Sequence, residues 1–137
     1  MEPILVYGFP AGSSMGLVAA LEWLGKPYSL CRVDMLGEMR DPSYARINAR
    51  HETPVLITDA GRALTETMAI AAWLEARDGE RRISFAPLSP EADRMHQLMG
   101  FVNTGFTAPS RRSGSRWRWR SRTRRCRHRC ASSALRG

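Results

Sequence analysis

The stretch that decides the fold reads Thr-Pro-Val-Leu at residues 53–56 and, shortly after, Leu-Thr-Glu-Thr-Met-Ala-Ile-Ala-Ala-Trp-Leu at residues 64–74. Pro54 has no N–H group and a fixed φ, so it suits the start of a strand rather than its centre. Glu66 and Thr67 precede apolar residues at helical spacing, which places them at the start of a helix. A helix N-terminus has unpaired N–H groups and a partial positive charge, which attract a carboxylate. Together the two segments predict a site for an extended, peptide-like ligand with a charged end.

Each segment also has an ordinary structural interpretation. A cis bond before Pro54 would leave the main chain of Thr53 facing outward, but only about 5–6% of X–Pro bonds are cis. The residues around Glu66 and Thr67 equally suit a simple helix cap with an acidic first turn. Taken one at a time, the segments favour these ordinary interpretations.

Charge is distributed unevenly along the 137 residues. Residues 1–108 contain 10 basic and all 13 acidic residues, a formal charge of −3, whereas residues 109–137 contain 11 arginines and no acid. No apolar run reaches the roughly 18 residues of a membrane span. The chain starts without a basic segment before an apolar one, and three scattered cysteines do not suggest a disulfide framework. A reduced, cytoplasmic compartment is therefore expected.

Apolar spacing and turn residues predict the order β-α-β followed by α-β-β-α. Strands are expected at residues 4–7, 28–33, 55–58 and 62–64, and helices at 13–25, 41–48, 66–77 and 90–106. The helix N-caps are expected at Ser13 or Ser14, at Asp41 and at Ser89, since short polar side chains accept hydrogen bonds from the first turn. Gly25 suits the end of the first helix.

The body of the chain resembles the N-terminal, thioredoxin-like domain of cytosolic glutathione S-transferases. The segments that carry the resemblance are 6–14, 20–28, 53–56 and 66–74, which look like the first strand and catalytic loop, the first helix and its exit, the cis-proline motif and the Glu-Ser/Thr-x-Ala-Ile helix. The resemblance implies an α/β fold. A thioredoxin-like βαβ-αββα domain is expected at 1–80, the linker and first helix of an all-α domain at 81–108, and a disordered, Arg-rich tail at 109–137.

The resemblance also implies that glutathione is the co-substrate. The main chain of Thr53, beside a cis Pro54, would pair with the cysteinyl part of glutathione. Glu66 and Thr67 would hold its γ-glutamyl end.

The glycyl carboxylate has a less obvious partner. The basic residue that often precedes the proline motif in this family is replaced here by Glu52. The resemblance therefore leaves His51 or Arg50 to contact this carboxylate, and His51 is included among the expected glutathione-binding residues.

The implied chemistry is activation of the glutathione thiol for attack on a small electrophile. Lowering a thiol pKa of about 8.5 by two units requires about 2.7 kcal/mol in favour of the thiolate. A helix N-terminus supplies about 0.3–1 kcal/mol and a hydroxyl hydrogen bond about 1.5–3 kcal/mol, so both are needed. Ser13 occupies the place of the family's catalytic serine or cysteine, Ser14 is its neighbour, and Tyr7 is the rival. Without the resemblance, Ser13 is a helix cap and Tyr7 a core residue.

Two other functions are considered. One is a non-catalytic, thioredoxin-like binding module whose basic arm binds nucleic acid through its arginines, with Trp117 and Trp119 for stacking. The other, a thiol-disulfide oxidoreductase, is disfavoured because Ser13 and Ser14 occupy the positions where a Cys-x-x-Cys motif is needed.

No membrane partner is expected. No metal is expected either, since Cys126, His128 and Cys130 are weak candidates for ligands without a partner pair. Members of the family form homodimers.

The tail suggests an out-of-frame translation rather than a nucleic-acid arm. Its Arg-, Ser- and Trp-rich composition without acids is typical of a shifted frame in GC-rich coding DNA. The hypothesis predicts that another reading frame near codon 108 restores apolar helical spacing. In the family the helical domain forms most of the electrophile pocket, so a chain truncated in this way would bind glutathione with impaired catalysis.

Overall fold

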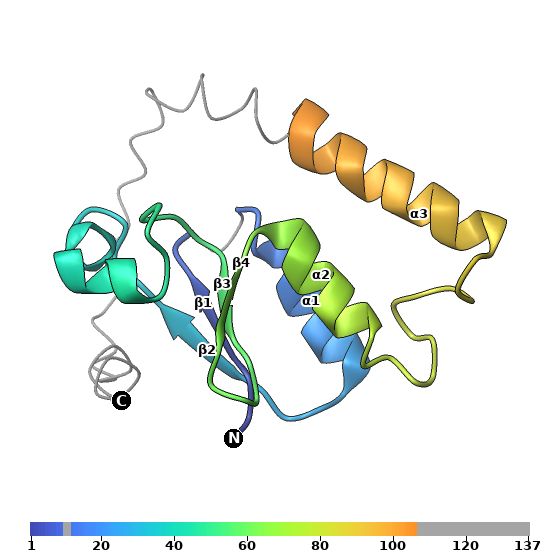
Figure 1. The fold of residues 1–137 in the computed structure, drawn as a ribbon, viewed down its shortest axis with the longest axis horizontal. Helices are drawn as coiled ribbons and strands as arrows, with labels where there is room; N and C mark the ends of the chain where they lie inside the picture. The colour runs from blue at the N-terminus through green and yellow to red at the C-terminus, as the bar shows by residue number, and fades with distance from the viewer. Residues whose placement is uncertain (10–11, 107–137) are drawn as a thin grey trace.

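The computed structural model describes residues 1–9 and 12–106, and Figure 1 shows its fold. Four strands form one sheet in the order β2-β1-β3-β4. β1 (Ile4–Tyr7) pairs in parallel with β2 (Ser29–Arg32) and antiparallel with β3 (Val55–Ile57). β3 in turn pairs antiparallel with β4 (Ala63–Thr65). The predicted mixed α/β domain is confirmed, with strand ends within one or two residues of those expected.

Helices cover both faces of the sheet. α1 (Met15–Leu24) and α2 (Thr67–Glu75) lie side by side on one face, as Figure 1 shows. The other face is covered by two short 3₁₀ helices, η1 (Glu38–Arg40) and η2 (Pro42–Arg46). The sheet is therefore the middle layer of three.

Strand alternation divides the core into two clusters, because successive side chains of a strand point to opposite faces. Leu5 and Leu56 are fully buried against α1 and α2, where they join Leu21, Ile70 and other apolar residues. Val6 and Val55 face the opposite side and pack with Cys31, Val33, Tyr44 and Ile57. Cys31 is buried, as expected.

Two local predictions need correction. The segment after Asp41 forms a 3₁₀ helix and not an α-helix, because the N–H groups of Tyr44 and Ile47 bond three residues back, to Asp41 and Tyr44. Asp41 does cap it, accepting from the Ser43 N–H at 2.8 Å. In α1 the N-cap residue is Ser14, but its side chain makes no capping hydrogen bond because its backbone is already helical.

Turns and later elements follow the predictions more closely. Gly25 and Gly61 adopt left-handed φ values of 64° and 75°, at the end of α1 and in the β3–β4 hairpin respectively. Ser89 caps α3 (Pro90–Phe101) by accepting from the Ala92 N–H at 3.2 Å. A π-helical turn, η3 (Val102–Phe106), follows α3. The predictions for the 109–137 tail lie outside the described residues.

Candidate functional site

Strand register brings the predicted site residues to one edge of the sheet. Val6 pairs with Val55, which pairs with Thr65 on its other side. Neighbouring strands lie about 4.8 Å apart, so the end of β1, the Thr53–Pro54 step and the start of α2 are adjacent. A Cβ placed on Gly8 would lie 3.4 Å from the Thr53 hydroxyl oxygen, so the segment after β1 passes close to Thr53.

The Thr53–Pro54 peptide bond is cis. The carbonyl before it, that of Glu52, accepts hydrogen bonds from the Asn48 side-chain amide at 2.8 Å and the Tyr44 hydroxyl at 3.1 Å. Within residues 1–9 and 12–106, no hydrogen bond involves the main-chain N–H or C=O of Thr53. The main chain of a ligand can therefore pair with that of Thr53. This is the arrangement that a cis bond before Pro54 implies, although most X–Pro bonds are trans.

Burial raises the pKa of Tyr44 to about 12, with a smaller contribution from Cys31. The Tyr44 hydroxyl therefore stays protonated at neutral pH and donates to the Glu52 carbonyl. Asn48 is buried as well, and its Oδ1 accepts from the Arg50 N–H at 3.0 Å. These contacts fix the conformation of the loop that leads to Thr53.

The N-terminus of α2 is open. Glu66 is its N-cap residue, with φ 70° and ψ 126°, and its side chain does not cap the helix. The first intrahelical bond runs from the Ile70 N–H to the Glu66 carbonyl at 3.0 Å, so the three preceding N–H groups have no partner within the helix. Thr67, half-buried, is the first residue of α2. This helix end offers donors and a partial positive charge to an anion.

Charged side chains surround this helix end. Arg50 lies 3.3 Å from the Glu66 carboxylate and 3.2 Å from that of Glu52, bridging the two. The His51 ring is turned toward the Met39 carbonyl, with Nδ1 at 2.8 Å. Arg50 was expected only as an alternative to His51. Its bridge to Glu66, sixteen residues along the chain at the N-cap of α2, has no signal in the sequence.

The two candidates for thiol activation lie on either side of the segment after β1. Tyr7 ends β1 and is half-buried, and its carbonyl accepts from the Val33 N–H at 2.9 Å. Ser13 is exposed just before α1, whereas Ser14 is buried. Exposure makes Ser13 the more accessible hydroxyl, and its catalytic role stays a prediction.

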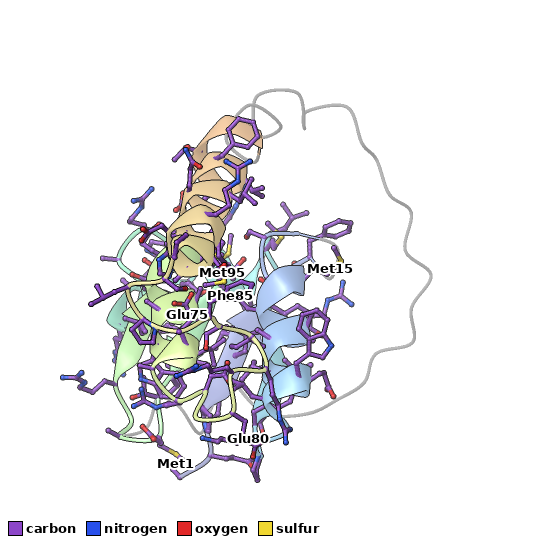
Figure 2. All side chains as sticks on the ribbon, turned by 90° about the vertical axis from the view of Figure 1, so that its right-hand side faces the viewer. Met1, Met15, Glu75, Glu80, Phe85 and Met95 are labelled. Atoms are coloured by element: carbon purple, nitrogen blue, oxygen red, sulfur yellow. The ribbon has the colours of Figure 1, made fainter. Side chains whose placement is uncertain are left out.

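A shallow apolar cavity of about 170 Å³ lies beside the site, between α1, α2 and α3. Thr67 and Glu75 of α2 line it, together with Met99 of α3. Glu75 also holds α3, through a contact of 2.8 Å with His96. Figure 2 shows Glu75 and Met95 where α3 passes α2, with Met15 at the exposed start of α1.

Metal-binding clusters and membrane-spanning helices are both absent from residues 1–9 and 12–106. No group of three or more His, Cys, Asp or Glu side chains there is arranged to hold a metal ion. None of the helices in that part of the chain has the length and apolar character needed to cross a membrane.

Comparison with solved structures finds the same fold in glutathione transferases. A homologue from Sulfitobacter with bound glutathione has 27% sequence identity and a TM-score of 0.68, over 75% of this chain and 49% of that one. A transferase from Phanerochaete chrysosporium with oxidized glutathione has 27% identity and a TM-score of 0.69, over 78% and 50%. One from Methylococcus capsulatus has 25% identity and a TM-score of 0.67, over 76% and 52%.

This chain thus spans about half the length of the solved structures that it matches. A search of curated proteins gives no match. The family model described as the glutathione S-transferase N-terminal domain matches residues 13–77. That model covers α1, the cis-proline step and α2, which are the elements that build the site above. The described domain therefore matches the N-terminal, thioredoxin-like domain of glutathione S-transferases in sequence pattern and in fold.

Proposed function

We propose that this chain binds glutathione at the sheet edge formed by Thr53, Pro54 and the start of α2. The open N-terminus of α2 is the observation that carries the proposal, because its unpaired N–H groups suit the γ-glutamyl carboxylate. The Thr67 hydroxyl adds a donor, and Glu66 takes the γ-glutamyl ammonium. The main chain of Thr53 pairs with the cysteinyl residue. Glutathione bound in one matched structure and oxidized glutathione bound in another support this assignment.

We further propose that the bound thiol is activated for attack on a small electrophile. The thiol loses its proton to solvent, and the sulfur forms a bond to the electrophilic carbon as a leaving group departs. The Ser13 hydroxyl donates to the thiolate, which together with a helix N-terminus supplies the roughly 2.7 kcal/mol needed for a two-unit shift. Tyr7 is the alternative donor.

The rate of transfer is expected to be low. The chain spans about half of each matched structure, and the family resemblance assigns most of the electrophile pocket to the helical domain. Glutathione binding depends mainly on residues of the first domain. We therefore propose that binding is retained while turnover is impaired, and that the protein acts in the cytoplasm.

Calorimetric titration with glutathione tests the proposed site. Thr67→Ala should weaken binding about tenfold, because it removes a hydroxyl donor to a charged group. Thr104→Ala, the same change on η3, is the matched control and should bind as the unmodified chain does, since its hydroxyl bonds to the Gly100 carbonyl. An unmodified chain that does not bind, or equal affinities for the two variants, would contradict the proposal.

Ser13→Ala tests the activation step separately. At pH 6, where the thiol itself is protonated, the variant should bind glutathione with nearly unchanged affinity. The pKa of the bound thiol, followed by the ultraviolet absorbance of the thiolate, should rise toward its free value of about 8.5. If the thiol pKa instead rises in Tyr7→Phe and not in Ser13→Ala, Tyr7 is the donor.

A further inference from the structure

An exposed methionine packs beside Thr53. Met35 follows β2 and is 42% exposed, and its side chain lies against Gly8 in the segment after β1. A Cβ placed on Gly8 would lie 2.6 Å from the Met35 Cγ and 2.8 Å from its Sδ, so the thioether fills the space that a side chain there would need. The same point lies 3.4 Å from the Thr53 hydroxyl oxygen. The Met35 sulfur is therefore close to the residue proposed to pair with the cysteinyl part of glutathione.

Hydrogen bonds on both sides of Met35 fix the loop that carries it. The Asp34 N–H donates to the Glu38 carboxylate at 2.9 Å, and the Asp34 carboxylate accepts from the Leu36 N–H at 2.9 Å. The Asp34 carbonyl accepts from the Met39 N–H, also at 2.9 Å. Because the main chain is held in this way, a chemical change at the Met35 sulfur acts first on the side chain and on what it touches.

Two other methionines are exposed in the part of the chain that the structure describes, and they lie elsewhere. Met1 is at the β3–β4 hairpin, where its Cε would lie 3.7 Å from a Cβ on Gly61. Met15 is 60% exposed at the start of α1, as Figure 2 shows. A dissolved oxidant reaches all three sulfurs, but the one on Met35 packs against the segment that passes Thr53.

We propose that Met35 is an oxidation site through which peroxides weaken glutathione binding. The inference rests on the proposed function and concerns the regulation of the same site. A lone pair of the thioether sulfur attacks one oxygen of hydrogen peroxide, and the O–O bond breaks. The departing hydroxide takes the proton of the transferred oxygen and becomes water. The sulfur loses two electrons and becomes a sulfoxide, and the peroxide is reduced by the same two electrons.

The sulfoxide cannot keep the contact that the thioether makes. Oxidation turns a flexible apolar side chain into a polar one. A polar oxygen is costly to hold where it has no hydrogen-bond donor, and the Gly8 Cα offers none, so the side chain turns toward water. The segment after β1 then loses its packing partner at the point where it passes Thr53. Dedicated reductases return methionine sulfoxide to methionine, so the change is reversible.

Calorimetric titration with glutathione, before and after treatment with hydrogen peroxide, tests this inference. Peroxide is removed with catalase and disulfides are reduced before each titration. The affinity of the unmodified chain should fall about three- to tenfold on oxidation, as expected for the loss of one side-chain contact. Treatment with both methionine sulfoxide reductases should restore it.

Two variants identify the sulfur responsible, each compared with itself before and after oxidation. Met35→Leu keeps an apolar side chain of similar size without a sulfur, so its affinity should change little on oxidation. Met15→Leu is the matched control, because it removes a sulfur that is more exposed. Its affinity should fall on oxidation as that of the unmodified chain does.

The outcomes separate this inference from the proposed function. If the unmodified chain does not bind glutathione before oxidation, the proposed site is wrong and the inference falls with it. If the chain binds, but oxidation leaves its affinity unchanged or weakens Met35→Leu equally, the site stands and the inference is wrong. Should Met35→Leu not fold, partly oxidised samples of the unmodified chain decide. Their affinity must fall with the fraction of Met35 sulfoxide measured by peptide mass spectrometry, and a loss that follows Met15 instead overturns the inference.

Discussion

Backbone strain at single residues coincides with the proposed site. His51 and Glu66 are two of four non-glycine residues with positive φ among the described residues, with values of 52° and 70°. Such conformations cost of order 1–3 kcal/mol and persist only where the surroundings impose them. His51 precedes the cis-proline step in the chain, and Glu66 lies next to it at the end of β4. The strained residues and the groups proposed to face the ligand therefore lie at the same edge of the sheet. Neither φ value could be predicted from the sequence, since neither residue is glycine or asparagine.

Replacing Glu66 with glycine should separate stability from binding. Glycine adopts φ 70° without penalty, so the substitution relieves the backbone strain at this position. Glycine also gives the unfolded chain more conformational freedom, which offsets part of this gain. The net effect of Glu66→Gly should be a rise of about 0.5–1 kcal/mol in the free energy of unfolding. Glutathione affinity should fall, because the carboxylate that receives the ammonium is lost. Urea denaturation and calorimetric titration measure the two effects. Ala72→Gly, at an exposed position within α2, should instead cost about 1 kcal/mol. A less stable Glu66→Gly would show that φ at this position is not strained.

At the level of elements, Asp78 organises the connection from α2 to α3. Its carboxylate accepts from the N–H groups of Arg82 at 2.9 Å and Ile83 at 2.8 Å, and from the Ser84 hydroxyl at 2.8 Å. Burial alone would raise the pKa of Asp78, but the hydrogen bonds from Ile83, Arg82 and Ser84 together outweigh it and lower this pKa. The linker is thus tied to the end of α2 before α3 begins.

Stability should therefore depend on the charge of Asp78. Because its pKa is lowered in the folded state, the stabilisation is present above the carboxyl's unfolded value of about 3.9 and is lost as pH falls through the folded value. Asp78→Asn should lower the urea midpoint at pH 6 and flatten its decline between pH 6 and pH 3. Asp93→Asn, an exposed acid in the first turn of α3, should leave the decline nearly unchanged. Equal pH slopes for Asp78→Asn and the unmodified chain would contradict this account.

At the scale of the whole molecule, large apolar side chains remain uncovered on two helices. Trp23 on α1 and Phe101 on α3 are each 65% exposed, and Met15 on α1 and Leu98 on α3 are also exposed. Exposed apolar patches mark interaction surfaces or promote association. The described part of the chain thus leaves apolar faces of α1 and α3 in contact with solvent.

Association should follow from this exposure. Sedimentation velocity at rising protein concentration should show reversible self-association that Phe101→Ser reduces, because the substitution removes a large apolar contact. Phe101 is exposed, so folding stability should be nearly unchanged. Leu36→Ser removes an apolar side chain that is 75% exposed on the loop before η1, away from both helices, and serves as the control. If both variants associate as the unmodified chain does, these helix faces do not drive association.

Local patterns predicted the domain well and the site only in part. The apolar residues 4–7 were sufficient to predict β1, and Gly25 marked the end of α1, where φ is positive. The cis bond before Pro54 required the family resemblance, because local sequence favours trans. The Arg50 bridge could not be predicted, because it depends on how the loop and the helix end are placed relative to each other.

The position of Cys31 has a consequence for a protein proposed to handle alkylating compounds. Its sulfur is enclosed between the sheet and η2, and no other cysteine occurs in the described part of the chain. Because this sulfur is buried, an electrophile in solvent would not reach it while the domain is folded. The described part of the chain therefore exposes no thiol of its own to such reagents.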